Sequence, residues 1–224
     1  MKLRMEQAGR IFFRSSGHAN YFYAVQPQDF ILEEGCVSVI TGRSGSGKTT
    51  LLHMLSGLLR ASEGRVLVDE KDLYDMSDKE RSRLRSQQFG IIPQGQTGLR
   101  CLTVMENVLL PVSMYGKARD KHRQAEQLLE EVGIGDLSEV YANELSGGEL
   151  RRMSVVRALI NDPAVIIADE PTGDLDDETT ALVMELLKRR AEKGASVLIV
   201  THDRDVPAYA DRRYQMDKGV LQTL

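Results

Sequence analysis

The sequence predicts an α/β fold built around a mostly parallel central sheet. Short apolar runs alternate along the chain with segments of helical periodicity, and this order is typical of strands joined by helical crossovers. Short strand-like runs are expected at residues 37–40, 89–93, 164–168 and 196–200. The run at residues 164–168 is apolar at every position, as expected for a central parallel strand covered on both faces. A glycine-rich segment follows the first of these runs and precedes a helix-forming segment. Together these observations place a loop between the first central strand and a helix.

The glycine-rich segment at residues 42–49 fits the phosphate-binding pattern G-x-x-x-x-G-K-[ST] at every fixed position. Its strand-like and helix-like flanks disfavour a turn that binds nothing, and they indicate a P-loop NTPase fold. We expect Lys48 to reach the β- and γ-phosphates and the Thr49 hydroxyl to ligate Mg²⁺. The residues expected to contact the nucleotide are Gly42, Arg43, Ser44, Gly45, Ser46, Gly47, Lys48, Thr49 and Thr50.

Length and composition indicate one α/β domain over residues 1–224. The net charge is −4 and charges of both signs are interspersed, so we expect no nucleic-acid partner and no polybasic membrane anchor. No apolar run approaches the ~18 residues of a membrane span, and residues 1–13 lack the core of a signal peptide. We therefore expect a cytoplasmic protein in which Cys36 and Cys101 are reduced bystanders.

The region from residue 1 to about residue 35 predicts a small antiparallel sheet. Aromatic runs at residues 11–13 and 21–23 flank a polar turn around residues 16–20. A further short strand is expected at residues 64–69. Ser77-Asp78-Lys79-Glu80 is a capping box that predicts a charged helix ending near Gln88.

Four further segments carry helical signals. We expect a helix from Thr103 to about Tyr115, interrupted by Pro111, and a second from Lys121 to Val132 that Gly133 closes. Ser146 is placed as the N-cap of a helix that the sequence at residues 161–163 stops. Asp176 caps another helix, which runs to Gly194.

Polar residues with a phosphate or metal role available follow the central strands directly. They are Gln94, the pair Asp169 and Glu170, and His202. Ligands of an open parallel sheet bind outside the carboxyl ends of its strands, so these residues should converge. We expect Asp169 to hold Mg²⁺, Glu170 to take a proton from the attacking water and His202 to contact the γ-phosphate. Solvated acids in a turn and a structural histidine are the alternatives.

Leu145-Ser146-Gly147-Gly148-Glu149 places a serine and two glycines at a helix start. Bare N–H groups and the helix dipole would favour a phosphate there, and a capped helix without a ligand is the alternative. Taken together, the motifs resemble those of ATP-binding-cassette (ABC) ATPases. The segments that carry the resemblance are residues 42–49, 94, 145–149, 165–170, 173–176 and 202. Residues 103–111 and 169–173 resemble the subfamily of lipoprotein-release, macrolide-export and cell-division ATPases.

The resemblance implies a head-to-tail dimer, in which Ser146, Gly147 and Gly148 of one chain close on the ATP held by the other. It also implies a separate membrane permease, which would hold the chain at the inner face of the cell membrane. The family's helical subdomain would cover about residues 95–159, inserted in the nucleotide-binding core. Gln94 would link this subdomain to the nucleotide and to Mg²⁺.

Three features bear on details of this resemblance. Asp174 stands where the subfamily usually has Asn, and Pro93 stands where it usually has Phe. The aromatic side chain that stacks on adenine is expected to be Phe13, with Phe12 and Tyr21 as the next candidates.

The function that these features indicate is an ATPase subunit driving a permease, as in an exporter or a lipid-, lipoprotein- or peptide-handling system. The alternative is an ATPase that powers a membrane regulator without transport, as in the cell-division branch. A soluble cassette ATPase of DNA repair or chromosome maintenance is disfavoured, because such proteins need a coiled-coil insertion, a zinc module or two cassettes, and this sequence contains none of them. A small-molecule kinase is also disfavoured, because it would leave residues 145–149 and His202 unexplained.

We expect a permease helix to contact the helical lobe that follows Gln94. The apolar residues expected to form this contact are Leu99, Leu102, Val104 and Leu109.

Overall fold

A computed structural model describes residues 1–13, 21–95, 97–115, 121–203 and 205–224. The strands are β1 (Leu3–Phe13), β2 (Tyr21–Leu32), β3 (Val37–Thr41), β4 (Glu63–Val68), β5 (Lys71–Asp72), β6 (Phe89–Ile92), β7 (Val165–Asp169), β8 (Ser196–Thr201), β9 (Arg212–Asp217) and β10 (Val220–Thr223). The α-helices are α1 (Lys48–Leu55), α2 (Asp78–Gln88), α3 (Val104–Tyr115), α4 (His122–Glu131), α5 (Gly147–Leu159) and α6 (Asp177–Glu192). None of the helices in these segments is long and apolar enough to cross a membrane.

The larger sheet has the strand order β10-β9-β3-β8-β7-β6. Four of its neighbouring pairs are parallel, and only β10 runs antiparallel to its neighbour β9. The mostly parallel central sheet is therefore confirmed. Strands β9 and β10 were not predicted from the sequence, because their residues are mostly exposed or half-buried and form no continuous apolar run.

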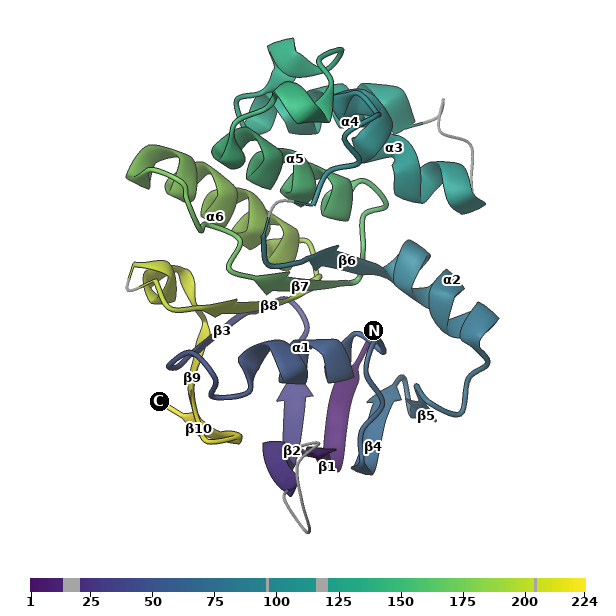
Figure 1. The fold of residues 1–224 in the computed structure, drawn as a ribbon, viewed down its shortest axis with the longest axis vertical. Helices are drawn as coiled ribbons and strands as arrows, with labels where there is room; N and C mark the ends of the chain where they lie inside the picture. Colours follow the sequence, from purple (N-terminus) through teal and green to yellow (C-terminus); the bar gives the residue numbers. More distant parts are fainter. Residues whose placement is uncertain (14–20, 96, 116–120, 204) are drawn as a thin grey trace.

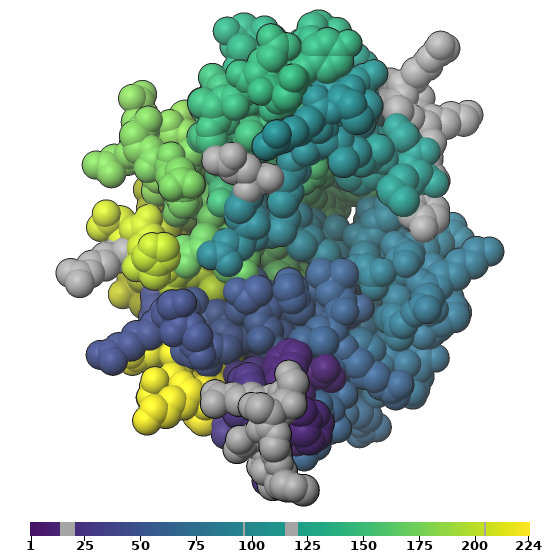
Figure 2. All heavy atoms as spheres, in the orientation of Figure 1, coloured from purple at the N-terminus to yellow at the C-terminus, as the bar shows by residue number. Residues whose placement is uncertain are grey.

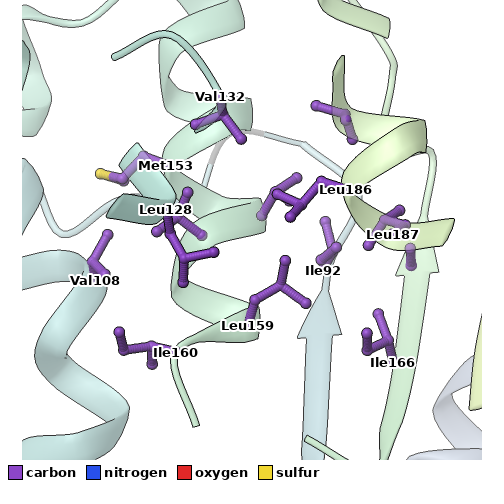
Figure 3. Packing of buried hydrophobic residues seen from close by; sticks show 14 of the residues in the cluster. Ile92, Val108, Leu128, Val132, Met153, Leu159, Ile160, Ile166, Leu186 and Leu187 are labelled. Atoms are coloured by element: carbon purple, nitrogen blue, oxygen red, sulfur yellow. The ribbon is translucent and has the colours of Figure 1, made fainter. Parts of the chain in front are cut away.

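Both faces of the central strands are covered, which explains their uninterrupted apolar sequence. In β7, Val165 and Ile167 pack with α1 and the N-terminal strands, whereas Ile166 and Ala168 pack with α5 and α6. Successive side chains of a strand point to opposite faces, so a strand between two layers must be apolar throughout. Figure 3 shows the face of the sheet that α5 and α6 cover, where Ile92 and Ile166 face Leu159, Leu186 and other helical residues.

The N-terminal strands form a separate sheet with the order β2-β1-β4-β5, in which every pair is antiparallel. This confirms the predicted antiparallel sheet and adds to it the strand expected near residues 64–69. Helix α1 lies between the two sheets (Figure 1). The polar turn expected at residues 16–20 lies outside the described residues.

Helices α3, α4 and the start of α5 lie at the end of the molecule opposite the antiparallel sheet (Figure 1). Helix α3 continues through Pro111, so the expected interruption is wrong. Proline removes one helical hydrogen bond, but Val108, Leu109 and Val112 around it are buried in the core, and this packing favours the intact helix. Treating residues 95–159 as a subdomain stays a prediction.

The helix caps agree with the sequence. Ser77 and Ser146 each form a complete capping box with a glutamate three residues later. Asp176 accepts a hydrogen bond from the Thr179 N–H at the start of α6. These local patterns depend on a few neighbouring residues, so sequence alone is enough to predict them.

Asp162, in the turn between α5 and β7, ties three helices together. Its carboxylate accepts hydrogen bonds from Lys121 (2.8 Å), Gln124 (2.8 Å) and Arg190 (2.9 Å). Burial acts to raise its pKa, but the hydrogen bonds from Lys121 and Gln124 and the Arg190 charge lower the pKa overall. The ionised form of Asp162 therefore stabilises the folded chain.

Candidate functional site

The glycine-rich loop between β3 and α1 is packed too closely for side chains at two positions. A β-carbon on Gly42 would lie 2.4 Å from the carbonyl oxygen of Met216, and one on Gly47 would lie 2.0 Å from that of Ala24. Gly47 also has a φ of 108°, which favours glycine. The Lys48 ammonium donates to the carbonyl oxygens of Gly42 (2.8 Å) and Arg43 (3.1 Å) and so lies over the loop. This arrangement places a positive charge and a helix N-terminus at one point, as phosphate binding requires.

Thr49 and Asp169 meet although 120 residues separate them in the chain. The Thr49 hydroxyl donates to Asp169 Oδ2 at 2.7 Å. Burial raises the pKa of Asp169, the hydrogen bond from Thr49 opposes this effect, and the neighbouring Glu170 charge adds to it. The fold thus brings a hydroxyl and a carboxylate together at the carboxyl ends of β3 and β7, as the sequence predicted.

Glu170 is the best-held carboxylate of the site. Its Oε2 accepts from the Thr201 hydroxyl at 2.8 Å, and its Oε1 lies 2.7 Å from Nδ1 of His202. The backbone N–H of His202 also donates to Oε1, at 3.1 Å. Glu170 is buried, whereas the His202 ring is largely exposed. The hydrogen bond with the Glu170 carboxylate raises the pKa of His202, and the charge of Glu170 adds to this effect.

These groups open onto a cavity of about 820 Å³. The sequence-predicted residues that line it are Gly42, Arg43, Ser44, Gly45, Gly47, Lys48, Thr49, Thr50, Gln94, Asp169, Glu170 and His202. Ser46, also a residue of the loop, is not among them because it is buried; its carbonyl oxygen accepts from the Gly219 N–H at 2.9 Å. The strand ends therefore converge on one site large enough for a nucleotide.

The aromatic residues of the cavity differ from the expected one. Phe13 is 81% exposed and does not line the cavity, and neither does Tyr21. Phe12, Phe22 and Tyr23 do line it. Adjacent residues of a strand point to opposite faces, so Phe12 and Phe13 cannot both face the cavity. Phe12, the second candidate, lines the cavity, and the identity of the aromatic side chain that stacks on adenine stays a prediction.

Lys218 and Gly219 also line the cavity, although neither was predicted from the sequence. They form the turn between β9 and β10, which the Gly219 backbone fastens to Ser46 and to the Gln26 N–H (2.9 Å each). The available signal was a glycine between two short alternating segments, which is typical of a hairpin.

Ser146, Gly147 and Gly148 do not line this cavity. Ser146 Oγ donates to Glu149 Oε2 at 2.7 Å, and hydrogen bonds from the Ser146 hydroxyl and N–H lower the pKa of Glu149. A β-carbon on Gly148 would lie 3.4 Å from Leu175 Cδ2, so the helix start packs on the turn that follows β7. Within one chain this segment is a capped helix start, away from the phosphate loop.

A second hollow, of about 640 Å³, lies between α2, α3 and α5. Its apolar lining includes Leu99, Leu110, Pro111 and Met114, and Figure 2 shows the surface recessed between the helical end and the α2 segment. Of the residues expected to meet a permease, only Leu99 lines it. Val104 and Leu109 are buried, so they offer no surface to a partner, and the expectation for these two is wrong. Leu102 is half-buried and does not line this hollow, so its contact with a permease stays a prediction.

Comparison with known proteins decides the family. A family model described as ABC transporter matches residues 25–173. The chain belongs to the ABC transporter family. This ABC ATPase is 39% identical over 225 residues to the lipoprotein-releasing system ATP-binding protein LolD of Xanthomonas campestris pv. campestris (strain 8004), a match that covers 99% of this chain and 92% of LolD.

Three further similarities concern the assembly. The chain is 37% identical over 220 residues to the macrolide export ATP-binding/permease protein MacB of Aggregatibacter actinomycetemcomitans, covering 98% of this chain and 34% of MacB. It matches the dimeric structure of MJ0796, a bacterial ABC transporter cassette, with a TM-score of 0.90 and 29% identity over 99% of this chain and 98% of that one. A post-hydrolysis dimer of the same cassette, bound to ADP and Pi, gives a TM-score of 0.88. The chain is accordingly an ATPase subunit of an ABC transporter.

Proposed function

We propose that this ABC ATPase binds Mg²⁺ and ATP in the 820 Å³ cavity and hydrolyses ATP with Glu170 as the general base. The observation that carries the proposal is the placement of Glu170. Its carboxylate is fixed by Thr201 and His202 beside the pair of Thr49 and Asp169, at the cavity that Lys48 also lines. A base needs this kind of fixed position within reach of a water at the phosphate.

The residues around Asp169 fit Mg²⁺. They offer a hydroxyl, a carboxylate and the side-chain amide of Gln94, which are the hard oxygen donors this ion prefers. In the described segments, no group of three or more His, Cys, Asp and Glu side chains is arranged so that it could hold a metal ion by itself. Bound there by Thr49, Asp169 and Gln94, the ion would neutralise charge on the β- and γ-phosphates.

The chain's own residues would divide the remaining work. Lys48 binds the β- and γ-phosphates as a point charge, because its ammonium can leave the two loop carbonyls for a stronger anion. Glu170 accepts the proton of the attacking water. His202, held by Glu170, donates towards the γ-phosphate, and its raised pKa favours the protonated form that can do so. Phe12 would stack on the adenine ring.

The site would be completed by a second copy of the chain in a head-to-tail dimer. The first-turn N–H groups of Gly147 and Gly148 have no partner within α5, and this helix start does not reach the cavity of its own chain. A γ-phosphate held by the partner's loop would satisfy these donors. The dimeric state of the similar MJ0796 cassette supports two copies as the working unit.

Mixing two inactive variants tests the shared site. Lys48→Ala and Ser146→Arg should each lose ATPase activity, and random pairing would place about half of the dimers in the mixed form. Each mixed dimer has one site with both defects and one intact site. ATP trapped at low temperature should therefore exceed that of either variant alone, and equal trapping in mixed and unmixed samples would refute sharing. Ser77→Arg, at another capping box, is the matched control and should stay active.

The 640 Å³ groove is proposed as the docking site of a helix from a membrane permease. Its apolar floor includes Leu99, 48% exposed, and Met114, 66% exposed, and a soluble chain rarely exposes such a patch without a partner. Arg85 and Arg157 also line it and could hold acidic residues or carbonyl groups of that helix. This docking would place the chain in the cytoplasm, at the inner face of the membrane.

Charged substitutions test the groove. Leu99→Glu and Met114→Glu should abolish co-purification with native membranes and leave ATP binding intact. Leu182→Glu is the matched control, because this leucine is 42% exposed on α6 and does not line the groove. Membrane association of the Leu99 and Met114 variants at the parental level would exclude the groove.

We propose an exporter or a lipid-, lipoprotein- or peptide-handling system as the transporter. The similarity to LolD and MacB supports this class. The alternative is a complex that uses the same ATPase cycle to regulate a membrane partner without moving a solute. Purifying the complex through this chain, and measuring uptake or release by vesicles that contain the identified permease, distinguishes the two.

A further inference from the structure

Arg151 is a buried cation near the catalytic carboxylates. It lies on α5, five residues after Ser146, and is only 4% exposed. One Nη donates to the carbonyl oxygen of Pro93 at 2.9 Å. No carboxylate in the described part of the chain forms an ion pair with it, and its Nε is buried without a hydrogen-bond partner. Burying a charge with so few partners costs folding free energy, which suggests that Arg151 has a role other than stabilising the fold.

The guanidinium lies between two parts of the proposed active site. On one side is Pro93, whose carbonyl precedes Gln94 in the chain. On the other side is the turn after β7: a β-carbon on Gly173 would lie 3.8 Å from Arg151 Nη2 and 3.8 Å from Glu170 Cβ. Burial lowers the pKa of Arg151, and the charges of Asp174, Glu170 and Asp169 oppose that effect. Arg151 thus stays in the field of three carboxylates that it does not directly pair with.

Helix α5 also begins with residues 146–148, the segment proposed to contact the ATP that the partner chain holds. Ser146 and Arg151 are separated by little more than one turn of α5, and the helix start packs on Leu175. A hydrogen bond from Arg151 to Pro93 therefore connects the start of α5 to the loop of Gln94 through one rigid element. The neighbouring Arg152 has no such connection, because it donates to the carbonyl oxygens of Val132 and Gly133 at the end of α4.

We propose that Arg151 is a positioning residue that fixes the Pro93–Gln94 backbone against α5, so that the Gln94 amide is held at the metal edge of the cavity. The inference rests on the proposed role of Gln94 in holding Mg²⁺. Gln94 itself is exposed and lines the nucleotide cavity, so little besides its backbone holds it in place.

A double-mutant cycle tests this coupling in the full chain. Arg151→Met removes the charge and the hydrogen-bond donors while keeping a side chain of similar length. Loss of the charged hydrogen bond to Pro93 should lower kcat by about tenfold or more. ATP affinity measured in EDTA should change by less than about twofold, while the Mg²⁺ concentration for half-maximal activity should rise, because the lost contact acts on Gln94. Arg151→Lys keeps the charge and one donor direction and should recover part of the activity.

In the cycle with Gln94→Ala, the double variant should be no slower than Gln94→Ala alone, since Arg151 would have nothing left to position. Arg152→Met is the matched control: it also removes a guanidinium from α5 and should leave the Mg²⁺ dependence unchanged. Thermal unfolding of each variant separates a folding defect from this effect. If Arg151→Met does not fold, Arg151→Lys takes its place in the cycle.

Two results would overturn the inference while leaving the proposed function intact. One is multiplicative losses of kcat in the double variant, with Gln94→Ala itself slowed but still measurably active. The other is an equal shift in Mg²⁺ dependence for the Arg152 control. Parental activity and parental Mg²⁺ dependence in Gln94→Ala would instead remove the proposed role of Gln94, and this inference with it.

Discussion

Replacing Glu170 by glutamine changes one proton-accepting group and very little of its surroundings. The amide has the same length as the carboxylate, so its oxygen can still accept from the His202 N–H. The Thr201 hydroxyl can rotate and accept from the new amide nitrogen where it now donates to Oε2. The variant should therefore fold as the parent does. It should also bind ATP at least as well, because one negative charge beside the triphosphate is gone.

The size of the catalytic loss separates a base from a structural carboxylate. Rearranging the hydrogen bonds at Thr201 and His202 should cost about 1 kcal/mol each, which is roughly fivefold per bond in rate. Loss of a general base costs about 10²–10⁴-fold, or about 2.7–5.5 kcal/mol in the barrier. We expect Glu170→Gln to fall within the second range.

Phosphate release at saturating Mg²⁺ and ATP measures kcat, and equilibrium binding of labelled ATP measures affinity. Asp174→Asn is the matched control. This substitution removes a carboxylate from the same turn, but Asp174 does not line the cavity, so the variant should hydrolyse ATP at a rate near that of the parent. A Glu170→Gln variant that hydrolyses ATP within tenfold of the parental rate would refute the assignment of the base. An equal loss in both variants would attribute the effect to charge.

Three other substitutions give further checks. Lys48→Ala should weaken ATP binding itself, measured by the same equilibrium assay, because its charge contacts ground state and transition state alike. Phe12→Ala should weaken ATP binding by about 5- to 100-fold if the ring stacks on adenine, whereas Phe13→Ala should have little effect; the reverse order would restore Phe13. Asp162→Asn should lower the melting temperature at pH 7 by about 2–4 °C, the equivalent of ~1 kcal/mol for a partly exposed network. Because folding lowers the pKa of Asp162, the difference in melting temperature between variant and parent should be full at pH values above 3.8, the unfolded-state pKa, and should shrink as the pH falls below that value. A difference that persists at low pH would attribute the effect to packing.

Much of the fold could be predicted because its signals are local. The run at residues 164–168 is apolar at every position, and only a strand between two layers, as β7 is, tolerates that pattern without exposing it. The caps at Ser77, Ser146 and Asp176 depend on residues within one helical turn. Pro111 shows the limit of local rules, since the packing of its apolar neighbours outweighs the proline's preference.

The same distinction explains which site residues could be found. Gln94, Asp169 and His202 follow strands of one parallel sheet, and the shared edge of that sheet brings them together whatever the loops do. Lys218 reaches the cavity from an antiparallel hairpin, which no rule about parallel strand ends covers.

Arg151 was hidden for a different reason. In sequence it is one of two adjacent arginines near the start of a helix, and a pair of adjacent charges usually marks a solvated face. The two differ only in direction: Arg152 turns to the end of α4, whereas Arg151 turns to Pro93 and the carboxylates after β7. Since consecutive helical residues lie about 100° apart around the axis, their roles depend on what packs against each side. The two arginines therefore differ in role because different parts of the fold pack against them, although their residue type is the same.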